Sequence, residues 1–200
     1  MDKNRYHHGN LRNCLIEKGI ELVNMEGEKH FSLRKVATMC GVSNAAPYSH
    51  FKNKEKLLEE MKNYVTGKFT EELHNSIKDE DSNNPSTLVK MGKSYVLFFI
   101  KNPQYYEFLF SQSSIRVNLS VNDEGKSNFP PFEILKELHF KILRQYGLTD
   151  EKIMDAVILA WATVHGLASI ATMKGVSYNR NWENKIEDII WNRNENYDWN

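Results

Sequence analysis

The chain of 200 residues has little of what builds disulfide-rich or disordered proteins: 2 cysteines, 5 prolines and 10 glycines. Two cysteines cannot form a disulfide framework. Because Cys14 and Cys40 have apolar neighbours, we expect reduced thiols in the core of a cytoplasmic protein. So few prolines and glycines argue against a disordered or linker-rich chain.

Long apolar runs and a targeting segment are also missing. No apolar run reaches the roughly 18 residues that a membrane-spanning helix needs. The first ten residues are polar, so we expect no signal peptide. Both features predict a protein without a membrane partner.

Neither sign of charge is in excess, because 26 basic residues balance 26 acidic ones. The total charge therefore gives no reason to expect a nucleic-acid partner. Residues 1–62, however, carry 11 basic and 8 acidic side chains, while the remainder has an acidic excess of the same size. The mild positive charge of residues 1–62 favours an anionic partner for this part of the chain.

The apolar residues recur at helical spacing along almost the whole chain. The predicted helices cover residues 10–25, 33–40, 43–51, 54–79, 86–101, 103–112, 131–146, 150–174 and 182–192. Ser32, Ser43, Asn53 and Thr149 or Asp150 are the expected N-caps. Residues 114–122 are the exception, because their apolar and polar residues alternate as in an extended segment.

This pattern predicts an all-α fold with two parts. We expect a small N-terminal domain of three helices at residues 1–60 and a larger helical bundle at residues 61–200. Three short helices are marginal as an independent fold. We therefore expect the first three to pack on the helix at 54–79.

Residues 32–54 contain two short helices joined at Gly41, the arrangement of a helix-turn-helix. The second helix of that motif enters a major groove about 12 Å wide, so its exposed face must be small or polar. Here that face would carry Ser43, Asn44, Ala45 and Ala46. An asparagine can pair with adenine through two hydrogen bonds, and an alanine methyl can contact that of thymine.

Phosphate contacts are expected beside this face. The candidate residues are Arg34, Tyr48, Ser49, His50 and Lys54. Lys54 has the further advantage of lying at the start of the next helix, whose N-terminus is itself positive. Each has an alternative without a function: residues 43–46 would be a solvated helix face, Tyr48 a half-buried aromatic residue, and the cations ordinary surface charges.

This stretch closely resembles the DNA-binding domain of the tetracycline-repressor-like (TetR) family of bacterial transcriptional regulators. The matching residues are Ser32-Leu33-Arg34, Val36-Ala37, Gly41-Val42-Ser43, Tyr48-x-His50-Phe51, Lys52-x-Lys54 and Leu57-Leu58. Residues 6–12 are similar to the entry of the first helix in one branch of the family. Trp161-x3-His165-Gly166 resembles that branch's "WHG" motif in the ligand domain.

The resemblance implies an all-α homodimer, joined through its last two long helices, on a roughly palindromic operator in double-stranded DNA. It further implies a repressor that a small-molecule effector releases from the operator. An alternative is a DNA-bound scaffold whose C-terminal domain binds a protein partner. A second alternative is a helical enzyme of unknown chemistry.

Residues 61–200 have two features that bear on effector binding and on dimerisation. Seven of the 23 aromatic residues fall within residues 95–110, which indicates either plain core or the lining of a pocket. The candidate ligand-binding residues are Tyr95, Phe98, Phe99, Tyr106, Phe110, His139, Trp161 and His165. The helix at 150–174 is too apolar for one buried stripe, so with the helix at 131–146 it predicts a four-helix dimer interface.

Signals for catalysis are poor. The sequence has no H-E-x-x-H, G-x-S-x-G, C-x-x-C or phosphate-binding loop, and His7 and His8 are adjacent and not at the helical spacing of metal ligands. We therefore expect no catalytic residues, no metal site and no cofactor.

Overall fold

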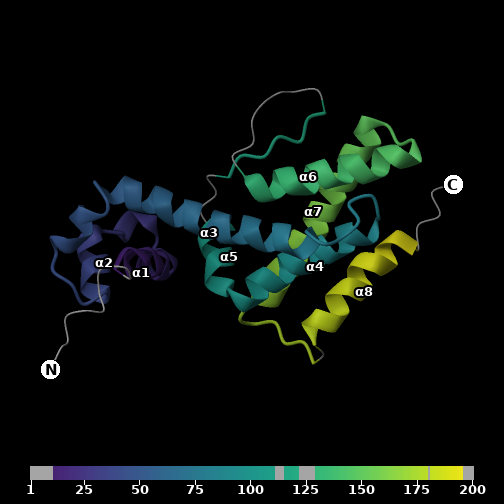
Figure 1. Ribbon diagram of the computed structural model, residues 1–200. Coiled ribbons are helices and arrows are strands. Elements are labelled where there is room, and N and C mark those ends of the chain that lie inside the picture. Colours follow the sequence, from purple (N-terminus) through teal and green to yellow (C-terminus); the bar gives the residue numbers. More distant parts are fainter. Residues whose placement is uncertain (1–10, 111–114, 122–128, 180, 196–200) are drawn as a thin grey trace. The chain divides into compact units, whose positions relative to one another are not determined.

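The computed structural model describes residues 11–110, 115–121, 129–179 and 181–195, and in that part of the chain every regular element is helical (Figure 1). The α-helices are α1 (Leu11–Glu26), α2 (Leu33–Met39), α3 (Lys54–Ile77), α4 (Ser86–Lys101), α5 (Pro103–Phe110), α6 (Pro130–Leu143), α7 (Asp150–Thr172) and α8 (Trp182–Glu195). Three 3₁₀ turns join them: η1 (Glu28–His30), η2 (Ala46–Ser49) and η3 (Arg144–Tyr146). The all-α prediction is confirmed.

The chain forms two compact units. The first is Met1–Gly67 together with Glu107–Gln112, and the second is Lys68–Tyr106 together with Ser113–Asn200. Helix α3 contributes residues to both units, because the division falls within it.

Local sequence signals set the helix ends. The Ser32 hydroxyl accepts the Lys35 backbone N–H at 3.3 Å, the Asn53 side chain accepts that of Lys56 at 2.9 Å, and the Thr149 hydroxyl accepts that of Lys152 at 3.4 Å. Each cap satisfies a backbone donor that the first helical turn leaves free. These three predicted N-caps are confirmed.

The predicted extended segment has no partner strand. Residues 115–121 are irregular, and residues 114 and 122 lie outside the described residues. A single extended segment gains no ladder hydrogen bonds, so alternation alone does not make a strand. The loop predicted after it falls mostly on residues 122–128, which are likewise outside the described part.

In the first unit, α2 packs on α1, and the start of α3 completes the core. Gly19 of α1 lies against Met61 of α3: a Cβ on this glycine would be 2.7 Å from the Met61 sulfur. A side chain at this position would therefore force the end of the buried Met61 side chain to shift. Arg12 pairs with Glu60, and the Tyr64 hydroxyl donates to Glu17 at 2.7 Å, so polar contacts also join α1 to α3.

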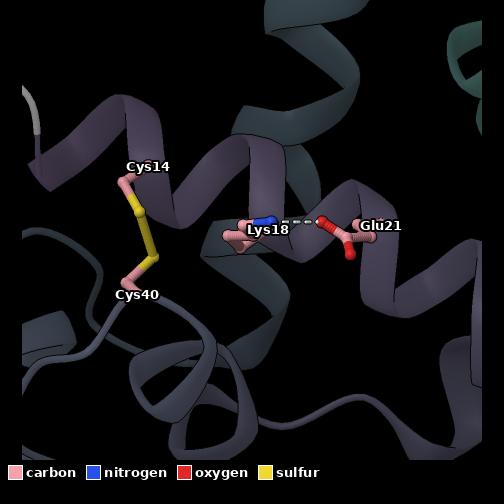
Figure 2. The surroundings of a disulfide bond; sticks show 4 residues. All are labelled: Cys14, Lys18, Glu21 and Cys40. Atoms are coloured by element: carbon pink, nitrogen blue, oxygen red, sulfur yellow. Dashed lines mark hydrogen bonds and ion pairs between the residues drawn. A yellow bond between two sulfur atoms is a disulfide. The ribbon is translucent and has the colours of Figure 1, made fainter.

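The two cysteines correct the sequence prediction. Figure 2 shows Cys14 of α1 and Cys40 at the end of α2 joined by a disulfide, with Cα atoms 6.2 Å apart. Both residues are half-buried, so they are not core thiols. Apolar neighbours in sequence indicated burial, but the pairing depends on how α1 and α2 pack.

In the second unit, α4 packs against α7 and α8, and α6 packs against α7 (Figure 1). Phe69 of α3 is fully buried among aromatic rings of α4. Gly92 of α4 meets both partner helices, since a Cβ there would lie 3.1 Å from Ile190 and 3.2 Å from Val164. The core of this unit is thus built around α4.

Helix α7 contradicts the expectation that no apolar segment is long enough to span a membrane. Among the described residues it is the one helix long and apolar enough to cross a membrane by length and composition, and only 28% of its apolar window is buried in the chain. A core helix of a soluble bundle passes the same test. The statement that no apolar segment reaches that length is therefore wrong for α7.

Candidate functional site

The segment that the sequence predicts to read DNA begins at a left-handed glycine turn. Gly41 has φ +68°, a conformation that costs glycine little and other residues more. The Val42 N–H donates to the Ala37 carbonyl at 3.0 Å and ties the turn back onto α2. The chain leaves this turn directly into residues 43–50.

The second helix of the pair is shorter and tighter than predicted. It is the 3₁₀ turn η2, and no side chain caps it, so the predictions of a helix over 43–51 and of a Ser43 side-chain cap are wrong. Pro47 explains the difference, because it has no N–H to donate to the Ser43 carbonyl in an α-helix. That carbonyl instead accepts the Ala46 N–H at 3.0 Å, which is a 3₁₀ bond.

The segment nevertheless presents a small and polar surface. Pro47 is buried and anchors it, and Ala46 is half-buried. The exposed residues are Ser43, Asn44, Ala45, Tyr48, Ser49 and His50. Side chains of this size can approach base edges, and hydroxyl and imidazole groups can donate to phosphate oxygens.

Two of these residues have distinct roles in the geometry. The Tyr48 side chain is 55% exposed, so the structure does not place it in the core, which was the alternative to a phosphate contact. The Ser49 hydroxyl donates to the Ala46 carbonyl at 2.7 Å, which leaves its oxygen lone pairs to accept.

The cations around the segment are not equivalent. Arg34 is exposed on the first turn of α2. Lys54, by contrast, donates to the Glu28 carbonyl at 2.7 Å and lies 5.8 Å from the centre of the Phe31 ring. Lys52 is exposed and lies two residues before it in sequence; the sequence prediction includes it only in the family motif. The Lys52-x-Lys54 spacing was the signal that could have added it to the site.

The predicted ligand-binding residues of α4 are core residues. Tyr95, Phe98 and Phe99 are 5%, 7% and 0% exposed. Phe69 packs on all three, with ring centroids 4.9, 5.0 and 4.6 Å away. Edge-on and stacked pairs at such distances stabilise a core beyond the area they bury.

A polar cluster lies at the edge of these rings. The Tyr95 hydroxyl is 3.1 Å from Nδ1 of His165, and the Tyr106 hydroxyl is 3.2 Å from Nε2. Burial lowers the pKa of His165 and raises those of Tyr95 and Tyr106, so all three groups are neutral near pH 7. One ring nitrogen then donates to a tyrosine oxygen and the other accepts from a tyrosine hydroxyl.

Trp161 lies beside this cluster and also lines a small apolar cavity. Its indole N–H is buried and has no hydrogen-bond partner that meets normal geometry. Burial raises the pKa of Tyr95, and the nearby indole N–H of Trp161 lowers it by a smaller amount. The cavity measures about 10 Å³, room for about one water molecule. Its lining residues are Leu73, Met91, Gly92, Tyr95, Phe129, Pro131, Phe132, Leu135, Trp161 and Val164.

The remaining two candidates lie elsewhere. His139 is 5% exposed, and its Nδ1 donates to the Leu135 carbonyl at 2.8 Å. Burial lowers its pKa to about 4, so it is a neutral core histidine. Phe110 belongs to the short segment that groups with the first unit.

A larger hollow of about 420 Å³ opens on the surface of the second unit, and the sequence analysis did not anticipate it. Its lining residues are Lys68, Glu71, Glu72, Asn75, Phe98, Lys101, Asn102 and Tyr105. The mixture of both charges with few apolar groups is unlike a typical organic-ligand pocket.

An exposed apolar face lies along α7. Leu135, Leu138 and Ile142 of α6 are at most 8% exposed, so these side chains pack inside the chain. A contribution of α6 to a dimer interface stays a prediction. Along α7 an apolar stripe remains exposed or half-exposed. It comprises Ile158, Leu159, Ala162, Gly166, Ile170 and, just beyond the helix, Met173.

Both regions described above fall within matches to known protein families. Residues 15–61 match a family described as "Bacterial regulatory proteins, tetR family". Residues 88–189, just over half of the chain, match one described as "Tetracyclin repressor-like, C-terminal domain". Neither is a family of enzymes.

One curated relative and two solved structures illustrate the likeness. The uncharacterized HTH-type transcriptional regulator YerO of Bacillus subtilis (strain 168) is 26% identical over 166 residues, which are 80% of this chain and 56% of that protein. The chain thus spans little more than half the length of this relative.

The solved structures share the fold at lower identity. AibR in complex with isovaleryl coenzyme A and operator DNA is 18% identical with a TM-score of 0.63, covering 90% of this chain and 95% of AibR. FadR from Bacillus subtilis in complex with stearoyl-CoA is 16% identical with a TM-score of 0.64, covering 89% and 96%.

Proposed function

Because the chain belongs to the tetR family of bacterial regulatory proteins, we propose that it is a sequence-specific DNA-binding regulator of transcription. It acts as a homodimeric repressor that a small-molecule effector releases from a roughly palindromic operator. The division of labour follows the chain: residues 1–60 bind DNA, and residues 61–200 bind the effector and the second subunit. Its place is the cytoplasm, where the DNA is.

The observation that carries the proposal is the exposed, small and polar segment after Gly41. Asn44 reads a base edge, and Ser43, Ala45 and Ala46 line the groove. Tyr48 and His50 contact phosphates, and Ser49 does so only if its hydroxyl leaves the Ala46 carbonyl. Arg34 and Lys52 add charge on either side, and Lys54 reaches phosphate only if it leaves the Glu28 carbonyl.

Selection of bound duplexes from a random DNA library, with the purified full chain, tests this function. We expect a palindromic consensus whose half-sites lie about 34–36 Å apart or somewhat more. Asn44→Ala is expected to relax the preference at one base pair per half-site, whereas Asn13→Ala, an exposed asparagine of α1, serves as the control. Binding with no sequence preference at physiological salt would refute the function.

The exposed stripe of α7 supports a dimer, since contiguous apolar surface is costly to leave in water. We propose that two copies meet there in an isologous contact. Leu159→Arg is expected to give a monomer by light scattering and to weaken operator binding. Glu137→Arg, on the exposed side of α6, introduces the same side chain away from the stripe and should leave the dimer intact.

The effector is proposed to enter where Trp161 and Tyr95 line the small cavity. The lining is uncharged, so the part of the effector that enters is apolar, with one group that accepts a hydrogen bond from the Trp161 N–H. The acyl-CoA complexes of AibR and FadR make acyl chains a reasonable first test. Any charged portion must then remain outside this lining.

A thermal-shift screen tests the effector site with short and long acyl-CoA, free CoA and simple aromatic compounds. An apolar compound is expected to raise the melting temperature and weaken operator binding, while free CoA does neither. Trp161→Phe keeps the ring and removes the donor, so it should reduce the shift. A screen in which no apolar compound stabilises the protein would contradict the site but not the DNA-binding function.

A further inference from the structure

The disulfide between Cys14 and Cys40 joins the two helices that support the DNA-reading segment. Cys14 lies on α1, and Cys40 is the C-cap of α2, where its N–H donates to the Val36 carbonyl at 3.0 Å. The next residue is the left-handed Gly41, and Ser43 follows two residues later. The bridge therefore holds the point from which the segment leaves α2.

Two further features bear on whether this pair can open and close. Both residues are half-buried, so neither is sealed inside the core. Figure 2 also shows an ion pair further along α1, in which the Lys18 ammonium is 2.6 Å from a Glu21 carboxylate oxygen. The chain has no third cysteine, so the pair can only open and close and cannot rearrange within one chain.

We propose that Cys14 and Cys40 form a reversible oxidation site that adjusts DNA binding. The oxidant is a hydroperoxide. One thiolate sulfur attacks the terminal peroxide oxygen: an S–O bond forms, the O–O bond breaks, and the cysteine becomes a sulfenic acid while water or an alcohol leaves. The second thiol then attacks the sulfenic sulfur and expels water, so two thiols and one peroxide give one disulfide with the peroxide oxygen reduced.

Reduction reverses the site by thiol–disulfide exchange. The thiolate of a low-molecular-weight dithiol attacks one sulfur to form a mixed disulfide, and its second thiolate releases the protein thiol. Cytoplasmic conditions favour the reduced state, so the bridge forms there only under oxidative load.

Closing the bridge has a calculable effect on the first unit. It spans a sequence separation of 26 residues. Loop-closure entropy alone then lowers the unfolding equilibrium constant by about 300-fold, an upper value because engineered bridges often deliver less. Since the same bridge fixes the end of α2, the oxidised protein is also expected to bind DNA several-fold more tightly; this second effect rests on the proposed function.

The experiment follows thiols, stability and DNA binding in the full chain. The reduced protein is treated with hydrogen peroxide and then with dithiothreitol. We expect free thiols to fall from two to zero without covalent dimers on non-reducing gels, the melting temperature to rise, and dithiothreitol to reverse both changes. The Cys14→Ser/Cys40→Ser variant should melt like the reduced protein and be insensitive to either reagent.

Three outcomes would overturn the site: thiols that stay free at peroxide levels that oxidise small thiols, disulfides between chains in place of the internal bridge, or a bridged protein no more stable than the double variant. DNA affinity is measured with a labelled duplex recovered from the library selection. Equal affinity of the oxidised and reduced forms would overturn the regulatory effect. If no duplex is recovered, the proposed function has failed while thiol counting and melting still decide the oxidation site.

Discussion

The neutral, buried His139 should make the stability of the second unit fall as the solution becomes acidic. Its folded pKa of about 4 lies below the ordinary value of 6.5, because burial disfavours the charged ring. The unfolded chain therefore binds a proton more readily than the folded one. The contribution is fully present above pH 6.5 and is lost as the pH falls from there towards 4.

The size of the effect follows from the two pKa values. Relative to neutral pH, the folded state loses about 0.7 kcal/mol at pH 6, about 2 kcal/mol at pH 5 and about 3 kcal/mol near pH 4. A domain is stable by only about 5–15 kcal/mol, so a loss of this size is easily measured. His165, whose pKa burial also lowers, adds to the slope in the same direction.

Urea denaturation at pH 7, 6 and 5 checks this with a variant that cannot titrate. His139→Gln can still donate to the Leu135 carbonyl, and its stability should fall about 2 kcal/mol less than that of the unaltered protein between pH 7 and 5. His74→Gln, an exposed histidine of α3, should keep the full slope. If His139→Gln shows the unaltered slope, the buried histidine does not cause the acid sensitivity.

Four further substitutions test the structure at other points. Arg34→Ala should weaken binding to all duplexes and lower the salt-dependence slope by about one, and an unchanged slope would remove Arg34 from the interface. Lys54→Ala should instead lower the melting temperature of the first unit, costing about 1–3 kcal/mol through the lost Glu28 contact. In urea denaturation Gly19→Ala should destabilise by about 1–3 kcal/mol because its Cβ would meet Met61. Gly67→Ala meets nothing within 4 Å and should stabilise by up to about 1 kcal/mol.

Much of the fold follows from short-range sequence signals. Ser32, Asn53 and Thr149 cap helices as predicted, because a cap needs only its own side chain and the next three residues. Pro47 shows the limit of this reasoning. The sequence places it within the first turn, where it is tolerated in an α-helix, yet its missing N–H selects the 3₁₀ form instead.

Features that depend on packing between distant residues were not predictable in this way. Helical periodicity identified the apolar faces of α6 and α7 equally well, but only the packed structure shows that α6 uses Leu135 and Leu138 internally while α7 leaves Leu159 outside. The disulfide and the Lys54 contact with Glu28 have the same origin, since each joins residues 26 positions apart.

The closed interior of the second unit links effector entry to α3. An organic ligand needs a pocket of roughly 300–1,000 Å³, and the cavity beside Trp161 measures about 10 Å³. Entry must therefore separate side chains that are now packed, among them Leu73, which lines the cavity, and the neighbouring rings around Phe69. Both residues belong to α3, which also supplies Met61 to the core of the first unit. A ligand that binds the opened packing more tightly thus shifts the conformational equilibrium of α3, the helix that contributes residues to both units. A difference in affinity between the two conformations worth about 1–3 kcal/mol is enough to change operator occupancy.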